Sequence, residues 1–202
     1  MYKIQAKKYI SILLVIILLT GCIRSFPGKD LPSRSYQDII IQPPKHSIDY
    51  NASYNFTYLS PGDTVHSKIR EMYLKEIEKV FSTTNYFQKF GSGPGLENYH
   101  LSMLLEVKGN GFTDIFSVVG FAISICLIPY YQREDYTLTV AVEKNNRVIK
   151  KYTYTDHINS YMQLFLWVIL ISSKYDPSEV REKIINNMLT NFLYDLSRDR
   201  IL

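Results

Sequence analysis

The chain has 202 residues, of which 46% are hydrophobic, a length and composition suited to one domain with a substantial core. Three of its 23 Lys and Arg residues lie in the first eight positions, and the remaining basic residues are nearly balanced by 19 Asp and Glu residues. The formal charge of +4 therefore belongs largely to the N-terminus, and the sequence does not predict a nucleic-acid partner.

The N-terminus has the order of features found in an export signal. Lys3, Lys7 and Lys8 precede the apolar run from Ile10 to Leu18, which is too short for a stable bilayer span. Leu19-Thr20-Gly21-Cys22 follows directly. This order resembles the lipobox signal peptide of bacterial lipoproteins. The resemblance implies that residues 1–21 are a signal peptide, that cleavage occurs before Cys22, and that Cys22 carries a thioether-linked diacylglyceryl with fatty acyl chains such as palmitate.

Lipidation at Cys22 would fix where the protein resides. Two or more acyl chains hold a protein stably on a membrane, whereas one chain holds it only marginally. Ile23, rather than Asp, follows the cysteine. By resemblance to Gram-negative sorting, this favours the outer membrane, and in a host with a single membrane it implies the outer face of the cell membrane. The alternative is an uncleaved membrane anchor with a chance cysteine.

The rest of the chain reads as a spacer followed by one domain. Residues 22–37 contain Pro, Gly, Ser and Arg without periodicity and are expected to form a lipidated tether. Residues 38–202 are expected to form a single domain. It begins with a short β-branched strand at 38–42, continues through an irregular stretch at 45–62, and enters an amphipathic helix over about 65–81.

The second half of the chain contains clearer local patterns. Apolar and polar residues alternate at 100–108, which predicts a half-buried strand. Two further alternating segments, 136–143 and 147–155, flank Asn145-Asn146 and predict a β-hairpin. Asp176-Pro177 predicts the N-cap and first turn of a C-terminal helix.

Two uncharged segments, 115–131 and 158–173, interrupt this pattern. They are near the lower length limit for membrane spans. They could be transmembrane helices, helices packed in the domain, or apolar elements that touch lipid or a partner. Two spans would separate the hairpin from the strand at 100–108, so the packed or interfacial interpretation is favoured. The expected fold is α+β: a small, mostly antiparallel sheet with helices on one face and two hydrophobic helical segments.

No group of residues in the sequence predicts catalysis. Gly91-Ser92-Gly93-Pro94-Gly95 lacks the context of a phosphate-binding loop, and the four histidines, at positions 46, 66, 100 and 157, share no metal-ligand spacing. Asp156-His157 could form an acid–base pair, but adjacent residues rarely face each other. Glu71, Glu76 and Glu78 are expected on a solvated helix face. We therefore expect no catalytic residue, no metal site and no cofactor, and Cys22 is the single predicted functional residue.

These expectations favour a non-enzymatic lipoprotein of the cell envelope with a binding or structural role. Its predicted partners are the membrane, through Cys22, and an envelope protein at the apolar segments. The alternatives are an accessory subunit of an envelope transport complex, or a protein with two transmembrane helices at 115–131 and 158–173.

Overall fold

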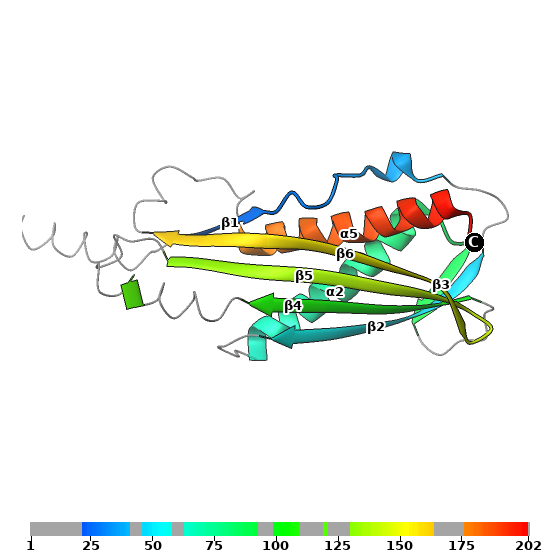
Figure 1. Cartoon of the computed structure of the whole chain (residues 1–202), viewed down its shortest axis with the longest axis horizontal. Coiled ribbons are helices and arrows are strands. Elements are labelled where there is room, and N and C mark those ends of the chain that lie inside the picture. The colour runs from blue at the N-terminus through cyan, green and yellow to red at the C-terminus, as the bar shows by residue number, and fades with distance from the viewer. Residues whose placement is uncertain are drawn as a thin grey trace, which may run out of the picture.

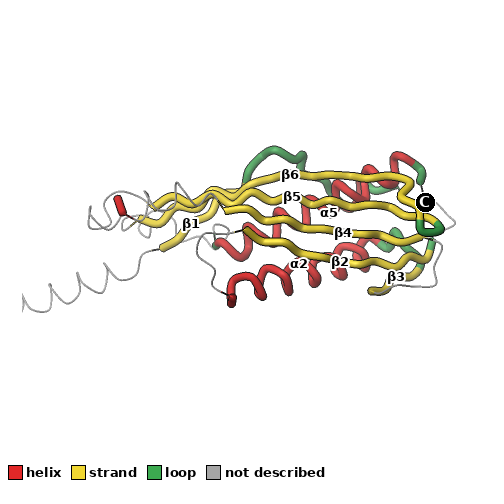
Figure 2. The backbone as a smooth tube through the Cα atoms, turned by 60° about the horizontal axis from the view of Figure 1, so that its bottom comes forward, coloured by secondary structure: helices red, strands yellow, loops and turns green. Residues whose placement is uncertain are grey.

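The architecture was obtained as a computed structural model, which describes residues 22–40, 46–57, 63–92, 99–109, 119–120, 130–163 and 176–201. Within these ranges the chain forms a long, curled, six-stranded sheet with two helices packed on one face (Figures 1 and 2).

The sheet is mixed, with strand order β1-β6-β5-β4-β2-β3. Its antiparallel part comprises β1 (Cys22–Pro27), β6 (Arg147–Gln163), β5 (Tyr130–Lys144) and β4 (Tyr99–Gly109). β2 (Ser47–Thr57) pairs in parallel with both β4 and β3 (Lys89–Ser92). Because parallel neighbours need a crossover, the chain between β2 and β3 passes through a helix.

That crossover is α2 (Asp63–Thr84), and the second helix is α5 (Pro177–Asp199). α2 packs against β2, α5 packs against β6 and β1, and the two helices contact each other. Asp176 caps α5 through its side chain, which accepts a hydrogen bond from the Ser178 backbone N–H at 2.8 Å, and Pro177 occupies the first turn. Both features agree with the pattern in the sequence.

The hairpin between β5 and β6 turns at Asn145-Asn146, where both residues have positive φ, 50° and 61°. Asn tolerates this left-handed conformation, which a tight two-residue hairpin requires. From this turn the two strands run almost the whole length of the molecule (Figure 1). The predicted hairpin is confirmed, but its strands are longer than the sequence pattern indicates.

The core lies between the sheet and the helices, and strict alternation along the strands builds it. On β4 and β5 the alternate residues from Tyr99 to Val107 and from Tyr136 to Val142 are buried, while their neighbours face the other side of the sheet. The helices contribute their apolar stripes to the same cluster. The largest fully buried side chains include Tyr73, Phe81, Leu101, Met103, Leu105, Tyr136, Leu138, Ile158 and Phe192.

The expected fold class is wrong in its main feature. The described chain is mostly β, and its sheet is a six-stranded mixed sheet rather than a small, mostly antiparallel one. Much of the difference comes from residues 47–57. The sequence predicts an irregular stretch here, but these residues form β2, the strand with parallel neighbours on both sides.

The N-terminal part of the chain is also more ordered than a tether. Residues 22–27 form β1 at the sheet edge, and residues 28–40, here called the N-terminal segment, pass along α5 (Figure 1). Asn191 donates a hydrogen bond to the Pro32 carbonyl at 2.9 Å, and the Arg34 guanidinium lies 4.0 Å from the centre of the Tyr194 ring. These contacts with α5, like the pairing of β1, lie within residues 22–37, for which the sequence predicts a lipidated tether.

The strand expected at 38–42 is not formed by the described residues 38–40. Tyr36–Asp38 form a single 3-10 turn, η1, capped by Ser35. Ile39 is buried, and the Ile40 backbone N–H donates to Ser197 Oγ of α5 at 3.4 Å. Ile39 therefore buries its side chain in the core, and Ile40 bonds its backbone to α5 rather than to a sheet, while the Ile40 side chain is 54% exposed.

The two uncharged segments are only partly within the described residues. Residues 158–163 belong to β6 and Tyr130 and Tyr131 to β5, so the helical expectation is wrong for these residues. Val119 and Gly120 are helical, and the remainder of 115–131 and of 158–173 lies outside the described residues. Among the described helices, none has the length and apolarity needed to cross a bilayer.

Candidate functional site

Cys22, the one functional residue predicted from the sequence, lies at one end of the sheet. It is the first residue of β1 and is in register with Gln163, the last residue of β6. Tyr130, the first residue of β5, is in register with Met162 of β6. Here β1, β5 and β6 extend past the end of β4, whose last pair is Gly109 with Glu134 (Figure 2). We call this three-stranded extension the Cys22 end of the sheet.

Aromatic side chains gather on the face of this extension that points away from α5. The rings of Phe26 and Tyr161 meet edge-on with centroids 5.9 Å apart, and those of Tyr131 and Tyr161 lie 5.2 Å apart. The Tyr131 hydroxyl donates to Asn159 Oδ1 at 2.8 Å. Each of the three strands thus contributes one ring to a cluster with both apolar surface and polar tips.

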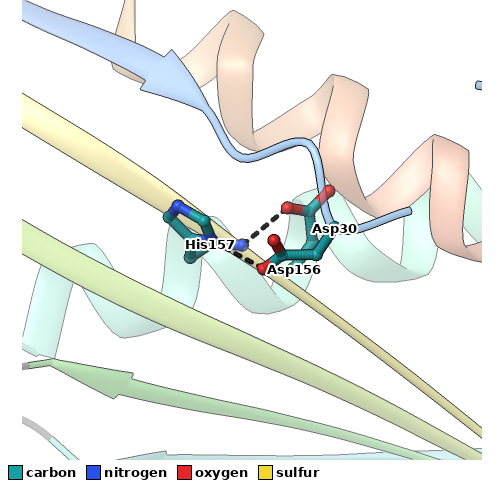
Figure 3. A group of neighbouring side chains, drawn as sticks. All are labelled: Asp30, Asp156 and His157. Carbon is teal, nitrogen blue, oxygen red and sulfur yellow. Dashed lines mark hydrogen bonds and ion pairs between the residues drawn. The ribbon is translucent and has the colours of Figure 1, made fainter. Parts of the chain in front are cut away.

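A second group of side chains lies where β1 leaves the sheet. The Gly28 backbone N–H donates to the His157 carbonyl at 2.6 Å, which extends the β1–β6 pairing by one residue. Two residues later, Asp30 turns back towards β6, and its Oδ2 lies 2.7 Å from His157 Nδ1. Asp156 Oδ1 accepts a hydrogen bond from the His157 backbone N–H at 2.8 Å (Figure 3). One ligand-type atom from each of Asp30, Asp156 and His157 lies within 4.8 Å of the others.

Gly28 makes this convergence geometrically feasible. A Cβ atom at residue 28 would lie 2.2 Å from Asp156 Oδ1 and 2.7 Å from His157 Nδ1, far inside van der Waals contact. Because glycine has no side chain, the backbone can pass directly beside both groups. The close passage brings Asp30 within reach of His157, from which it is separated by 127 positions in the sequence.

The three side chains differ in their environments. Asp156 is 4% exposed, whereas the Asp30 side chain is 53% exposed and that of His157 is 16% exposed. Burial raises the pKa of the Asp156 carboxyl above its ordinary value, and the negative charge of Asp30 adds to this effect, while the His157 backbone N–H opposes it. A buried carboxyl therefore lies at the base of the cluster, with an exposed carboxyl above it.

The cluster borders a groove of about 780 Å³ between the N-terminal segment and α5. Asp156 lines one end, and Tyr36 lines the groove further along the N-terminal segment. Asn186 of α5 donates to both the Tyr36 hydroxyl and Glu76 Oε2 at 2.8 Å. The groove is thus bounded by groups whose positions are fixed by hydrogen bonds, and it gives small ligands access to Asp156.

A third polar group is enclosed in the core beneath the sheet. Glu134 is 2% exposed and accepts hydrogen bonds from Arg181 of α5, at Nε and at one terminal nitrogen, and from the Tyr136 hydroxyl at 2.6 Å. Burial opposes the charge on Arg181, but the bonds to Glu134 outweigh it and raise the pKa of the guanidinium. This arrangement is a satisfied, bidentate ion pair that joins the sheet to α5.

The other residues considered in the sequence remain apart. The His46 ring packs on Tyr99 with centroids 5.0 Å apart, His100 Nδ1 lies 3.9 Å from Asp49 Oδ2, and the side chain of His66 lies outside the described residues. Glu76 was expected on a solvated face but is 1% exposed and bound by Lys79 at 3.0 Å. The sequence shows Asp156 and His157 as neighbours, but Asp30, whose Oδ2 lies 2.7 Å from His157 Nδ1, was missed because no sequence pattern links it to them.

No protein-family model and no curated protein matches the sequence. Solved structures align over most of the chain at low identity. PelC from Paraburkholderia phytofirmans, solved as a dodecamer, shares 11% identity over 85% of this chain and 95% of its own, with a TM-score of 0.33. A neuraminyllactose-binding hemagglutinin homologue from Helicobacter pylori shares 7% identity over 78% and 86%, with a TM-score of 0.48.

A minor lipoprotein from Acinetobacter baumannii is another of these similar structures. It shares 16% identity over 73% of this chain and 91% of its own, with a TM-score of 0.34. Lipoproteins are thus among the structures with which this chain aligns, but similarity at this level assigns neither a family nor an activity.

Proposed function

We propose that this protein is a lipid-anchored lipoprotein of the cell envelope with a non-enzymatic binding or structural role, held against a membrane at the Cys22 end of the sheet. One observation carries the proposal. The lipobox cysteine Cys22, Tyr130 from the end of the first uncharged segment, and residues 162–163 of the second all meet at this end of three paired strands.

This convergence is informative because the three pieces are far apart in the sequence. In the β1–β6–β5 register, Cys22 pairs with Gln163, and Met162 pairs with Tyr130. Neighbouring strands lie about 5 Å apart. An acyl chain on Cys22 would therefore begin within about 10–15 Å of the points where both uncharged segments join the sheet.

The aromatic cluster at this end also suits a membrane interface. Tyr side chains are enriched where one end of a ring meets hydrocarbon and the other meets water. Tyr131 and Tyr161 present such amphipathic rings at the Cys22 end, Phe26 adds an apolar ring beside them, and the uncharged segments provide apolar surface that can enter a leaflet. We propose the outer membrane as the destination in a Gram-negative host, on the basis of Ile23 alone.

The first test is the Cys22→Ser variant in the native host. We expect the wild-type chain to incorporate an alkyne-tagged palmitate analogue and to fractionate with membranes, and the variant to lose the label and keep its leader. Intact-mass measurement of the wild-type chain provides the check. An unmodified Cys22 thiol or a retained Met1 would contradict the proposal.

The second test separates the Cys22 end from the rest of the surface. Leu166→Glu places a charge in the second uncharged segment, and Val148→Glu places one near the hairpin turn at the opposite end, where Val148 is 60% exposed. With purified full-length protein and phospholipid vesicles, we expect Leu166→Glu to weaken binding at least tenfold and Val148→Glu to leave it unchanged. Equal binding by both variants, or a stable stoichiometric protein partner lost with Leu166→Glu, would favour a transport-complex subunit instead of direct lipid contact.

A further inference from the structure

We propose that Asp30, Asp156 and His157 form a binding site for a divalent transition-metal ion of the Zn²⁺ type. This inference goes beyond membrane anchoring and is independent of it. Within the described part of the chain, these residues are the one group of three or more His, Cys, Asp or Glu side chains whose ligand atoms converge.

The donor set has the chemistry of a zinc site. One imidazole nitrogen and two carboxylate oxygens are ligands that Zn²⁺ accepts at about 2.0–2.2 Å. An imidazole among so few oxygens disfavours Ca²⁺, which takes six to eight oxygen ligands, and Mg²⁺, which prefers oxygen and water in an octahedron. Two carboxylates with a neutral imidazole carry a charge of −2, which a divalent cation neutralises.

The contact between His157 and Asp30 shows how the ion can enter. With 2.7 Å between Nδ1 and Oδ2, one proton is shared between these atoms when no metal is bound. A cation can replace that proton if the two atoms separate to about 3–3.5 Å, the spacing of neighbouring ligands around tetrahedral zinc. Because the Asp30 side chain is half-exposed and lies on the N-terminal segment, it can make this adjustment without disturbing the sheet.

The rest of the site is held in place by backbone contacts. Gly28 is hydrogen-bonded to the His157 carbonyl, and its lack of a side chain leaves space beside Asp156 Oδ1 and His157 Nδ1. The His157 backbone N–H orients the Asp156 carboxylate, as outer hydrogen bonds orient the ligands of known metal sites. Asp156 lines the groove of about 780 Å³, so a fourth ligand from water or a small anion can reach the ion.

The competing interpretation is a purely structural His–Asp pair, and the chain offers a matched example of one. His100 Nδ1 lies 3.9 Å from Asp49 Oδ2, on neighbouring strands β4 and β2, with side-chain exposures of 25% and 12%. Asp49→Asn and His100→Gln therefore serve as controls, because they make the same substitutions as the site variants but lie outside the proposed metal site.

The experiment uses the full-length protein, purified in detergent and stripped of metal with a chelator. Titration with Zn²⁺ alone, followed by calorimetry, is expected to give one saturable site. Asp30→Asn and His157→Gln are each expected to weaken zinc binding at least tenfold, whereas Asp49→Asn and His100→Gln leave it unchanged. Far-UV circular dichroism without metal checks that each variant folds, and Asp30→Asn, at an exposed residue, is the variant least dependent on packing.

A second readout distinguishes coordination from nonspecific adsorption. Co²⁺ in a site with nitrogen and oxygen ligands has a visible absorption spectrum, which should be present in the wild type and in Cys22→Ser and absent from His157→Gln. Absence of saturable zinc binding, or equal affinity in the wild type and Asp30→Asn, would overturn the metal site. Because Cys22→Ser is expected to keep the site, a failure of membrane anchoring would leave this result intact.

Discussion

Two buried carboxylates, Glu134 and Asp156, lie on the helix-facing side of neighbouring strands, 2% and 4% exposed. They are diagonal neighbours in the sheet, because Tyr136 pairs with Asp156 and Glu134 pairs with Ile158. Glu134 is held by the Arg181 guanidinium and the Tyr136 hydroxyl, whereas Asp156 has a backbone N–H, a histidine and a second carboxylate around it. The environment of Glu134 supplies a fixed counter-ion, Arg181, whereas the environment of Asp156 contains no Arg or Lys partner among the described contacts.

The difference follows from where each strand is covered. Glu134 faces α5, so a cation on that helix can reach it in the closed core. Asp156 lies at the point where β1 departs from β6, and there the neighbouring element is the N-terminal segment with Asp30. A saturated ion pair is typical of a structural role, while converging acids beside an imidazole are typical of a ligand site.

The largest expected effect comes from removing the counter-ion of Glu134. Arg181→Met should lower the free energy of unfolding by about 3–5 kcal/mol, because it leaves a buried carboxylate unpaired. Urea denaturation of the full chain measures this. Lys183→Met, on the same helix, removes an exposed pair with Glu179 at 4.0 Å and should change the free energy of unfolding by less than about 0.5 kcal/mol. If Arg181→Met and Lys183→Met lower the free energy of unfolding equally, Glu134 and Arg181 do not form a buried ion pair.

An intermediate effect is expected at Gly28. Gly28→Ala places a Cβ atom against Asp156 and His157, and overpacking of this kind costs about 1–3 kcal/mol. Gly91→Ala is the control, because a Cβ atom there meets nothing within 4 Å. The free energy of unfolding of this variant should stay within about 0.5 kcal/mol of the wild-type value. Denaturation midpoints of the two variants compare them directly, and a neutral Gly28→Ala would contradict the close approach of backbone and side chains.

The smallest effect on stability is expected at Asp156 itself. In the absence of metal, Asp156→Asn should change the free energy of unfolding by less than about 1 kcal/mol, because the amide oxygen can still accept the His157 N–H and repulsion from Asp30 is removed. The same denaturation assay applies. A loss as large as that of Arg181→Met would mean that Asp156, like Glu134, serves mainly to hold the fold together.

Local patterns in the sequence predicted the parts of the fold that depend on local physics. The helices α2 and α5, the strand β4 and the Asn145-Asn146 hairpin each follow from periodicity, capping or turn chemistry in adjacent residues. The extension of β6 through 158–163 was missed because these uncharged residues were grouped with the hydrophobic segment 158–173. Within this extension Ser160 is buried, and its hydroxyl is satisfied by that of Ser25 on β1 at 2.6 Å.

The parallel strands and the Asp30 cluster could not be predicted in the same way. Residues 47–57 form strand β2 because they pair with β4 and β3, and this pairing depends on tertiary contacts rather than on the local sequence. Likewise, Asp156 and His157 were visible as neighbours, but their relation to Asp30 depends on a backbone crossing at Gly28. The predicted role of Cys22 rests on the lipobox alone, since its side chain lies outside the described residues.

The position of β1 has a consequence for biosynthesis. Ribosomes make Cys22 to Pro27 early, but their hydrogen-bonding partners, residues 158–163, come some 135 positions later. Until that late segment emerges, the first strand has no edge to join, and enzymes that act on a nascent N-terminus meet an unfolded peptide. Completion of the sheet then places the same residues in regular structure, so this edge of the sheet can form only after residues 158–163 have been made.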